Sequence, residues 1–241
     1  MHKILLFSPI SQAKAYILPK WIRWIKALGN LQPATCNLQI LLIDNSPNRK
    51  LEHDLRKIGI HCEYHNPKGK RIIDIIAACQ ERAREYAMEK NFDFLFSLEC
   101  DVFPPVQMII DLLLQHRKPV VSATYFIEYG PNSQLCLQQR YKDTFTRWQT
   151  YFNLDHGTWL IDVDGSLKTG QQAGLGCTLI HRSVLEKIKF RTEPDKIYPS
   201  DSYFYTDLDT NGIPYFVDTS LLCQHYSQPW AHDSYQEKSK V

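Results

Sequence analysis

Three of the acid-x-acid triplets in this chain are the residues that could best hold a divalent cation. They are Glu99-Cys100-Asp101, Asp162-Val163-Asp164 and Asp207-Leu208-Asp209. Hard cations such as Mg²⁺ and Mn²⁺ prefer carboxylate oxygens, and they commonly bind one or two of these together with the phosphates of a substrate. A triplet alone is a weak signal, so the neighbouring sequence has to distinguish the three.

Only the first triplet directly follows a predicted buried strand. The apolar stretch FDFLFSL, Phe92 to Leu98, precedes Glu99 and Asp101, and two prolines follow soon after. Open α/β sheets bind their ligands beyond the carboxyl ends of the strands, which is where these acids stand. The second triplet, in IDVDG, is typical of a hairpin, and the third of a solvated helix or turn. For Glu99 and Asp101, a plain solvated strand end remains the alternative interpretation.

Predicted strands and helices alternate through the first half of the chain. Apolar runs predict strands at Ile4–Phe7, Leu38–Asp44, His61–His65 and Phe92–Leu98, and in PVVSATYF. Apolar residues at helical spacing predict helices at Tyr16–Leu28 and Arg71–Glu89, and in MIIDLLLQH. Because the strands are continuously apolar rather than alternating, we expect an α/β fold with a mostly parallel sheet covered on both faces.

The second half of the chain is less regular. From Glu128 to Gly174 the sequence is polar and aromatic, which indicates long loops or a small antiparallel piece. A strand running into a helix follows in GLGCTLIHRSVLEKIKF, then SDSYFYTDLDTNG, a strand in IPYFVD and the segment LLCQHY. The tail after Trp230 is polar.

Composition excludes several classes of protein. The chain has 241 residues and a formal net charge of +2, which is too small to argue for nucleic-acid binding. Its seven cysteines are scattered without a CxxC pair, so neither a zinc ribbon nor a disulfide framework is indicated. Reduced thiols in the cytoplasm are the simplest interpretation. No apolar run has the length of a membrane span or of a signal peptide.

The predicted helix Tyr16–Leu28 is the one segment with a membrane alternative. It is basic and amphipathic and carries two tryptophans, so it could rest on a membrane surface as a peripheral anchor. A first helix packed on the sheet is the favoured interpretation.

Four segments, in this order along the chain, resemble glycosyltransferases with the GT-A nucleotide-sugar fold, of a family-2-like kind. LLIDNS is similar to their second strand, and FDFLFSLECDVFPP resembles their metal-binding strand, where an acid-x-Asp motif often precedes Pro-Pro. GLGCTLIHRSVLEKIKF is similar to their glycine-rich acceptor-side strand and helix. SDSYFYTDLDTNGIPYFVDTSLLCQH resembles the segment that carries the catalytic acid and a later histidine. The resemblance runs from Ile4 to about His225, and the middle segment from Glu128 to Gly170 contributes little to it.

The resemblance implies a single Rossmann-like three-layer domain over residues 1–241. Residues 1–127 would form the nucleotide-binding half, residues 128–228 the acceptor-binding and catalytic half, and residues 229–241 a tail. It implies a metal-dependent, inverting transfer of a sugar from a nucleotide-sugar donor to a hydroxyl group. The acceptor could be a glycan, a lipid or a protein.

The resemblance also assigns the metal ligands and the catalytic base. Asp101 would bind the metal, His225 would be a further ligand, and Glu99 would lie near the ribose or the metal's waters. A histidine ligand suits Mn²⁺ better than Mg²⁺. Asp201 would be the general base for the acceptor hydroxyl. The plain alternatives are a core histidine for His225 and a helix N-cap for Asp201.

Further residues would contact the nucleotide and the sugars. Asp44 would lie near the nucleotide, and Gly174 and Gly176 would let the backbone approach the donor sugar and the acceptor. Trp230, like Trp148 and Trp159, could stack on a sugar ring. Asp44 could instead only form a turn, and the glycines could mark a bulge or a close packing contact.

The sequence departs from the family pattern at several positions. The triplet begins with Glu99, has Cys100 at its centre, and Ser200 precedes the catalytic acid where relatives have another acid. Gln80-Glu81 stands where many relatives have Arg-Asn. Two other functions remain open. Sugar nucleotidyltransferases share the fold but have a glycine-rich loop after the first strand, and SPISQAKAY has no glycine. A non-catalytic module that binds glycans or a partner is the third hypothesis.

Overall fold

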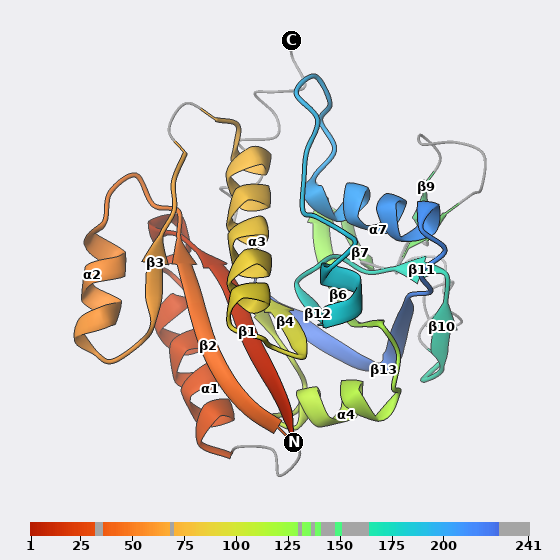
Figure 1. Ribbon diagram of the computed structural model, residues 1–241, viewed down its shortest axis with the longest axis horizontal. Coiled ribbons are helices and arrows are strands. Elements are labelled where there is room, and N and C mark those ends of the chain that lie inside the picture. The colour runs from red at the N-terminus through yellow and green to blue at the C-terminus, as the bar shows by residue number, and fades with distance from the viewer. Residues whose placement is uncertain are drawn as a thin grey trace.

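A mixed β-sheet with helices on both faces forms the centre of the molecule (Figure 1). The computed structural model describes residues 1–31, 36–67, 70–129, 132–135, 138–140, 148–150 and 164–226. The strands of the large sheet are β1 (His2–Ile10), β2 (Cys36–Asp44), β3 (Cys62–Tyr64), β4 (Phe94–Leu98), β5 (Val102–Phe103), β6 (Val120–Tyr129), β7 (Asn132–Leu135), β10 (Leu167–Thr169), β12 (Cys177–His181) and β13 (Phe216–His225).

Helices and a second, small sheet complete the described part of the chain. The helices are the 3-10 turn η1 (Gln12–Lys14), α1 (Leu18–Leu31), α2 (Lys50–Lys57), α3 (Ile72–Glu89), α4 (Ile109–Gln115), α6 (Arg182–Leu185) and α7 (Ser200–Thr210). The small antiparallel sheet consists of β8 (Gln138–Arg140), β9 (Trp148–Thr150) and β11 (Gln171–Gln172). Most of the remainder of the segment from Glu128 to Gly170 lies outside the described residues.

The large sheet is mostly parallel, as the sequence predicts. Its main path runs β10-β13-β6-β12-β4-β1-β2-β3. Strands β3, β2, β1 and β4 are parallel, and β12 lies antiparallel between β4 and β6. Since β13 is parallel to β6, the strands β1, β2, β3, β4, β6 and β13 all point one way. Their carboxyl ends therefore meet along one edge. Strand β12 runs the other way in the middle of the sheet, as do β5, β7 and β10 beside β13 and β6, and the apolar pattern could not reveal these directions.

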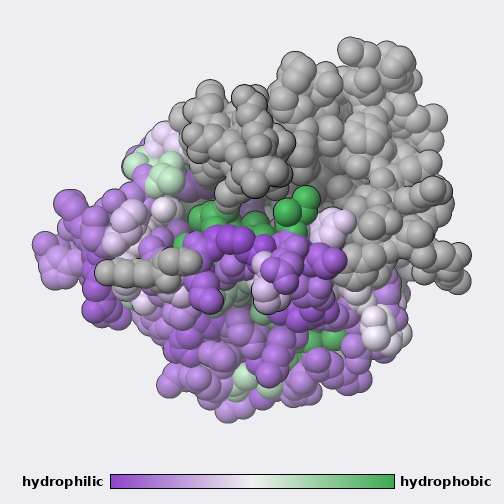
Figure 2. Space-filling view, turned by 90° about the horizontal axis from the view of Figure 1, so that it is seen from above, coloured by the Kyte–Doolittle hydropathy of each residue, from purple (hydrophilic) through white to green (hydrophobic). Residues whose placement is uncertain are grey.

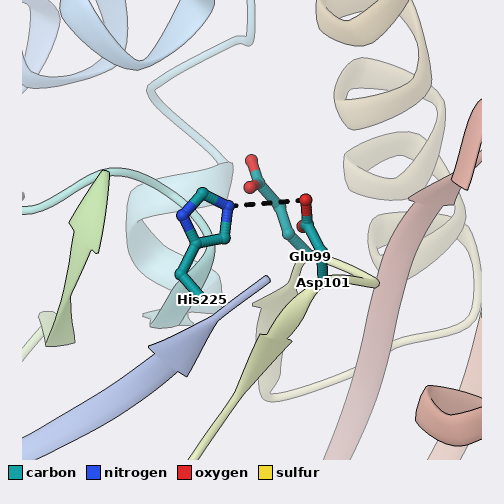
Figure 3. A group of neighbouring side chains, drawn as sticks. All are labelled: Glu99, Asp101 and His225. Atoms are coloured by element: carbon teal, nitrogen blue, oxygen red, sulfur yellow. Dashed lines mark ion pairs between the residues drawn. The ribbon is translucent and has the colours of Figure 1, made fainter. Parts of the chain in front are cut away.

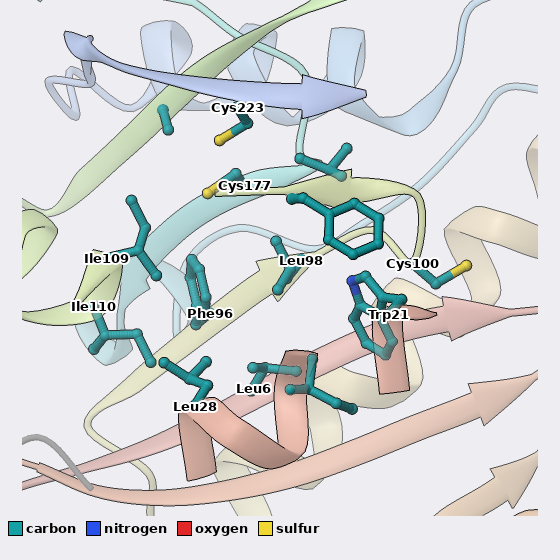
Figure 4. Close-up of a cluster of buried hydrophobic side chains, with 14 of the residues drawn as sticks. Leu6, Trp21, Leu28, Phe96, Leu98, Cys100, Ile109, Ile110, Cys177 and Cys223 are labelled. Atoms are coloured by element: carbon teal, nitrogen blue, oxygen red, sulfur yellow. The ribbon is translucent and has the colours of Figure 1, made fainter. Parts of the chain in front are cut away.

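Both faces of the sheet are covered by helices, which explains the continuously apolar strands. In β1, Ile4 and Leu6 belong to one buried cluster, and Leu5 and Phe7 to the other. Helices α1 and α4 cover the first face, shown in Figure 4 with Trp21 and Leu28 beside strand residues such as Phe96 and Leu98. Helices α3, α6 and α7 cover the second face.

The first helix packs on the sheet. Leu18, Trp21, Ile25 and Leu28 form its apolar face, and all of them are buried. This agrees with the favoured interpretation, because the face that could have rested on a membrane is in contact with the core. Among the described residues, no helix combines the length and the apolar character needed to cross a membrane.

Three local features complete the comparison with the sequence prediction. Helix α2 lies where only a turn after Asp44 is expected, since its eight residues are mostly polar. The expected strand IPYFVD and the segment LLCQHY form a single strand, β13, with a register shift between Asp218 and Leu222. The six cysteines in the described part of the chain are buried and free, in agreement with the expected reduced thiols.

Candidate metal and nucleotide site

Glu99, Asp101 and His225 come together at the carboxyl edge of the sheet. Their ligand atoms all lie within 4.8 Å of one another, and the side chains point toward one another (Figure 3). The short strand β5 brings them together, because it pairs antiparallel with the end of β13 and sets Val102 opposite His225. The backbone N–H of Tyr226 also donates to the Asp101 carbonyl at 2.9 Å. This pairing joins segments more than a hundred residues apart, so sequence periodicity could not show it.

Asp101 is the most deeply buried member of the cluster, with 1% of its side chain exposed. Its Oδ2 pairs with the Lys14 ammonium and lies 3.4 Å from His225 Nε2. Its Oδ1 is buried and has no hydrogen-bond partner among the described residues. Burial alone would raise the pKa of Asp101, but His225 and Lys14 outweigh it and hold this pKa below its usual value. An ionised oxygen buried without a donor is costly, and a cation at this point would satisfy it.

His225 is oriented in the way that metal-binding histidines usually are. Its Nδ1 donates to the Phe126 carbonyl at 2.8 Å, which leaves Nε2 facing Asp101. Histidines that bind metals commonly donate their other ring N–H to a carbonyl or carboxylate, which fixes the tautomer and the ring. Burial lowers the pKa of His225, while the carboxylates of Asp101 and Glu99 raise it to a net value above the ordinary one.

Glu99 completes the cluster and is half-buried. Burial raises the pKa of Glu99 to about 7, and the charges of Asp101 and Asp201 add to this effect, although Lys14 and His225 oppose it. Like charges close together disfavour the ionised form. The edge thus concentrates three acids, and Glu99, Asp101 and His225 supply the oxygen and nitrogen ligands that a divalent cation would need.

Lys14 is the residue of this site that the sequence did not reveal. It ends η1, in the loop that follows β1, and its ammonium reaches Asp101 across the carboxyl edge. In the sequence, the stretch SPISQAKAY is informative only through its lack of glycine. A single lysine in such a loop carries no signal of its own, because its partner stands 87 residues later in the chain.

A cavity of about 160 Å³ adjoins the cluster. Its walls are the loop after β1, Asn45 after β2, Ile72 and Ile76 at the start of α3, and the segment from Glu99 to Asp101. Seen from above, this edge of the molecule has hydrophobic residues in the middle, with hydrophilic residues below and to the left of them in the view (Figure 2). A larger cavity of about 410 Å³, around His2 and His181, lies at the opposite edge of the sheet and is remote from the acids.

Asp44, expected near the nucleotide, is fully buried. Its Oδ1 accepts from the Ser46 backbone N–H and its Oδ2 from the Glu52 backbone N–H, both at 2.9 Å. Both oxygens therefore hold the turn and the start of α2. This placement favours a structural role for Asp44, while its neighbour Asn45 faces the cavity.

Asp201 lies in the first turn of α7, the helix that packs with α3 on the second face of the sheet. It is not the N-cap of the helix, because Pro199 occupies that position. Burial raises the pKa of Asp201, and backbone N–H groups of its own residue and of Leu175 oppose this effect. Its charge also contributes to the raised pKa of Glu99, which places the two carboxylates in the same electrostatic environment.

Two of the departures from the family pattern contact each other. The Ser200 hydroxyl donates to Gln80 Oε1, and both side chains are buried. This bond joins the first turn of α7 to α3, next to Asp201. Gln80 and Ser200 therefore hold the first turn of α7, which carries the candidate base, against α3.

Gly174 and Gly176 lie just before β12 and are buried. The Gly176 N–H donates to the Tyr125 hydroxyl at 3.2 Å, and its carbonyl accepts from the Glu99 N–H at 2.9 Å. The Gly174 carbonyl accepts from the Thr178 hydroxyl. Gly176 thus fixes the backbone of Glu99, and contact of either glycine with a sugar remains a prediction. Trp230 lies outside the described residues, as do Trp159 and the side chain of Trp148.

Replacing Gly176 with alanine should destabilise the protein, because the new Cβ would lie 2.6 Å from the Tyr125 hydroxyl oxygen. Overpacking a buried site costs about 1–3 kcal/mol, and urea denaturation should show that loss in the free energy of unfolding. Gly29→Ala is the matched control. Gly29 lies in helix α1, and a Cβ added there would meet the Ile40 side chain of β2 at an ordinary 3.7 Å. The Gly29→Ala protein should therefore be as stable as wild type or more stable. Equal stability of wild type and Gly176→Ala would contradict the close contact.

Comparison with known proteins shows the fold. No family model matches the sequence, and no curated protein matches it. The structure of GalNAc-T7 with UDP, GalNAc and Mn²⁺ is similar with a TM-score of 0.57 and 10% identity, over 95% of this chain and 44% of that one. S. aureus TarS is similar with a TM-score of 0.54 and 13% identity, over 94% of this chain and 37% of that one.

An enzyme of another class has the same fold. CMP:2-keto-3-deoxy-manno-octonic acid synthetase, solved with CTP, is similar with a TM-score of 0.52 and 13% identity, over 99% of this chain and 98% of that one. The predicted GT-A-like α/β fold is thereby confirmed, and the three structural neighbours named here are enzymes that use nucleotide sugars or make them. This chain corresponds to less than half of the TarS and GalNAc-T7 chains, and at these identities the likeness concerns the fold alone.

Proposed function

We propose that this protein is a metal-dependent glycosyltransferase that moves a sugar from a nucleotide-sugar donor to a hydroxyl acceptor with inversion. The observation that carries the proposal is the cluster of Glu99, Asp101 and His225, in which the buried Asp101 Oδ1 has no hydrogen-bond partner among the described residues. The cluster stands at the carboxyl edge of the sheet, beside a cavity. That edge is where open α/β sheets bind their ligands.

Asp101 and His225 would hold the cation, with Glu99 bound to it directly or through its waters. A divalent cation at this position would act as a Lewis acid that stabilises the charge on the departing nucleoside diphosphate. Histidine nitrogen favours Mn²⁺ over Mg²⁺, so Mn²⁺ is the first choice. GalNAc-T7, a neighbour in fold, was solved with this ion and UDP, which supports the choice.

Asp201 would accept the proton of the acceptor hydroxyl as it attacks the donor sugar. A carboxylate that acts on the acceptor implies direct displacement and therefore inversion at the anomeric carbon. The raised pKa of Asp201 makes it a stronger base than an ordinary aspartate. Asn45, Ile72 and Ile76 would line the nucleotide pocket, and the glycines at 174 and 176 would border the sugars.

A sugar nucleotidyltransferase is the second candidate. The CTP-bound synthetase matches this chain over nearly the full length of both, and Lys14 lies in the loop after β1, where it could meet a triphosphate. The same loop has no glycine, which argues against this class. Preference for a nucleoside triphosphate over the diphosphate would favour the second candidate.

A melting-temperature screen tests the proposal. We expect one of UDP, GDP, CDP and dTDP to raise the melting temperature with Mn²⁺, and we expect EDTA to abolish the shift. A ligand at 100 times its Kd adds about 2.7 kcal/mol of stability to the folded state, which a melting curve resolves. Mg²⁺ in place of Mn²⁺ gives the metal preference, and CTP and UTP separate the two enzyme classes.

Two results of this screen would contradict the proposal. A shift of equal size with Mn²⁺ and with EDTA would show nucleotide binding without the metal site. No shift with any nucleotide and metal would favour a non-catalytic module that binds glycans or a partner.

A further inference from the structure

Lys14 contacts both the candidate metal cluster, through Asp101, and the cavity beside it. Its ammonium pairs with Asp101 Oδ2, the oxygen that also lies 3.4 Å from His225 Nε2. The same side chain lines the cavity that extends from Asn45 to Glu99. The Lys14 side chain is 22% exposed, whereas that of Asp101 is 1% exposed. Lys14 can therefore turn away from the carboxylate through solvent, and Asp101 cannot follow it.

A divalent ion and the Lys14 ammonium would compete for Asp101. Two positive groups on one carboxylate repel each other strongly, and the repulsion is greater where little water is present to screen it. An ion bound at Glu99, Asp101 and His225 therefore requires the ammonium to move or binds against its charge. Lysine suits such a movement, because its ammonium is a point charge on a flexible four-carbon stem.

The neighbouring cavity would offer the ammonium a further anionic partner when the diphosphate group of a nucleotide occupies it. Among the described residues that line this cavity, Lys14 is the only basic one, and Glu99 and Asp101 are acidic. The diphosphate group of a nucleotide would therefore enter a negatively charged space unless Lys14 turned toward it. Lysine commonly binds phosphate as a point charge.

We propose that Lys14 is a displaceable cation, which pairs with Asp101 in the unloaded protein and moves to the diphosphate group when metal and nucleotide bind together. This inference rests on the function proposed above, because it concerns the same metal and nucleotide site. It predicts positive coupling between the two ligands. The diphosphate group draws the ammonium away from Asp101 and so favours metal binding, and the metal releases the ammonium for the diphosphate group. By linkage, the nucleotide must strengthen metal binding by the same factor as the metal strengthens nucleotide binding.

The coupling is measured by titrating the full chain with Mn²⁺ in the absence and presence of nucleotide. The electron paramagnetic resonance signal of free Mn²⁺ reports how much of the ion is bound. Without nucleotide, Lys14→Met should bind Mn²⁺ about tenfold more tightly than wild type, because the competing charge is gone. UDP, GDP and CDP are then added in turn. For the nucleotide that binds, wild type should show coupling of about 5–150-fold, and Lys14→Met should lose most of it. Lys14→Arg keeps the charge and should retain most of the coupling.

Lys50→Met is the matched control, because Lys50 pairs with Asp54 on the surface of α2 and removing it changes the net charge equally. It should behave as wild type does. Equal Mn²⁺ affinity in wild type and Lys14→Met would overturn the inference and leave the metal site in place. Loss of affinity for both ligands in Lys14→Met would also overturn it, since Lys14 would then be a structural support. If wild type binds no Mn²⁺ with or without nucleotide, the proposed function fails and the inference fails with it.

Discussion

Asp101→Ala should abolish metal-dependent nucleotide binding. The substitution removes the buried Oδ1 that has no partner among the described residues and the Oδ2 that faces His225. Changes to residues that only support a metal ligand cost about 10–100-fold in affinity, so loss of a ligand itself should cost at least as much. Calorimetric titration with Mn²⁺ and the nucleotide identified by the melting screen measures this effect.

The same substitution affects the fold, so the experiment needs a second variant. Without the carboxylate, the Lys14 ammonium and the partly buried His225 lose their acceptor, and breaking a buried pair costs about 3–5 kcal/mol. Asp101→Asn keeps the size of the side chain and should fold while binding the metal poorly. Asp54→Ala, which removes an exposed acid on α2, should bind the nucleotide as wild type does. If a folded Asp101→Asn or Asp101→Ala protein bound metal and nucleotide normally, Asp101 would not be a ligand.

The fold was predictable because its signals are local. Strands β1, β2 and β4 carry apolar residues toward both helical layers, so their sequences alone indicate a covered, mostly parallel sheet. The position of Glu99 and Asp101 at the end of such a strand follows from the same pattern. Helix α2 escaped prediction because its hydrophobic face is short, with Leu55 as its main buried apolar residue.

The assembly of the candidate site was less predictable, because it depends on contacts between distant segments. The pairing of β5 with β13 brings His225 to Asp101, and a strand of two residues leaves almost no trace in a sequence. Lys14 contacts Asp101 only because the loop after β1 and the end of β4 lie side by side in the fold, and the two residues are 87 positions apart in the sequence. Asp44 shows the opposite case, since an acid at the end of a strand turned out to have both oxygens in backbone hydrogen bonds. A polar residue at the correct edge is therefore a candidate, and its hydrogen bonds decide its role.

Asp201→Asn should remove sugar transfer and leave nucleotide binding intact. The amide keeps the shape of the side chain at the start of α7 but cannot accept a proton, and loss of a general base costs about 10²–10⁴-fold in rate. The metal cluster of Glu99, Asp101 and His225 does not include this residue, so Mn²⁺ and nucleotide should bind as in wild type. Release of the nucleoside diphosphate from the donor, with water as acceptor, gives a rate before the natural acceptor is known.

Asp209→Asn is the matched control, because it makes the same change at an exposed position in the last turn of the same helix. It should transfer sugar as wild type does. Full activity in Asp201→Asn would exclude Asp201 as the base. Loss of nucleotide binding together with activity would make it a binding residue instead.

The raised pKa of Asp201 adds two dependences on pH, one of the reaction rate and one of the stability. Since the base must be ionised, the rate should fall with decreasing pH at values above the ordinary range of aspartate. The contribution of Asp201 to the stability of the fold should change in the opposite direction and increase as the pH falls. The folded state binds this proton more tightly than the unfolded chain, whose carboxyl titrates near 3.8, so Asp201 costs stability as the pH rises through its folded pKa. Asp201→Asn should therefore be more stable than wild type at pH 7 in urea denaturation, and the difference should shrink toward pH 4. An inactive variant of increased stability would identify Asp201 as a carboxylate kept under strain for the reaction.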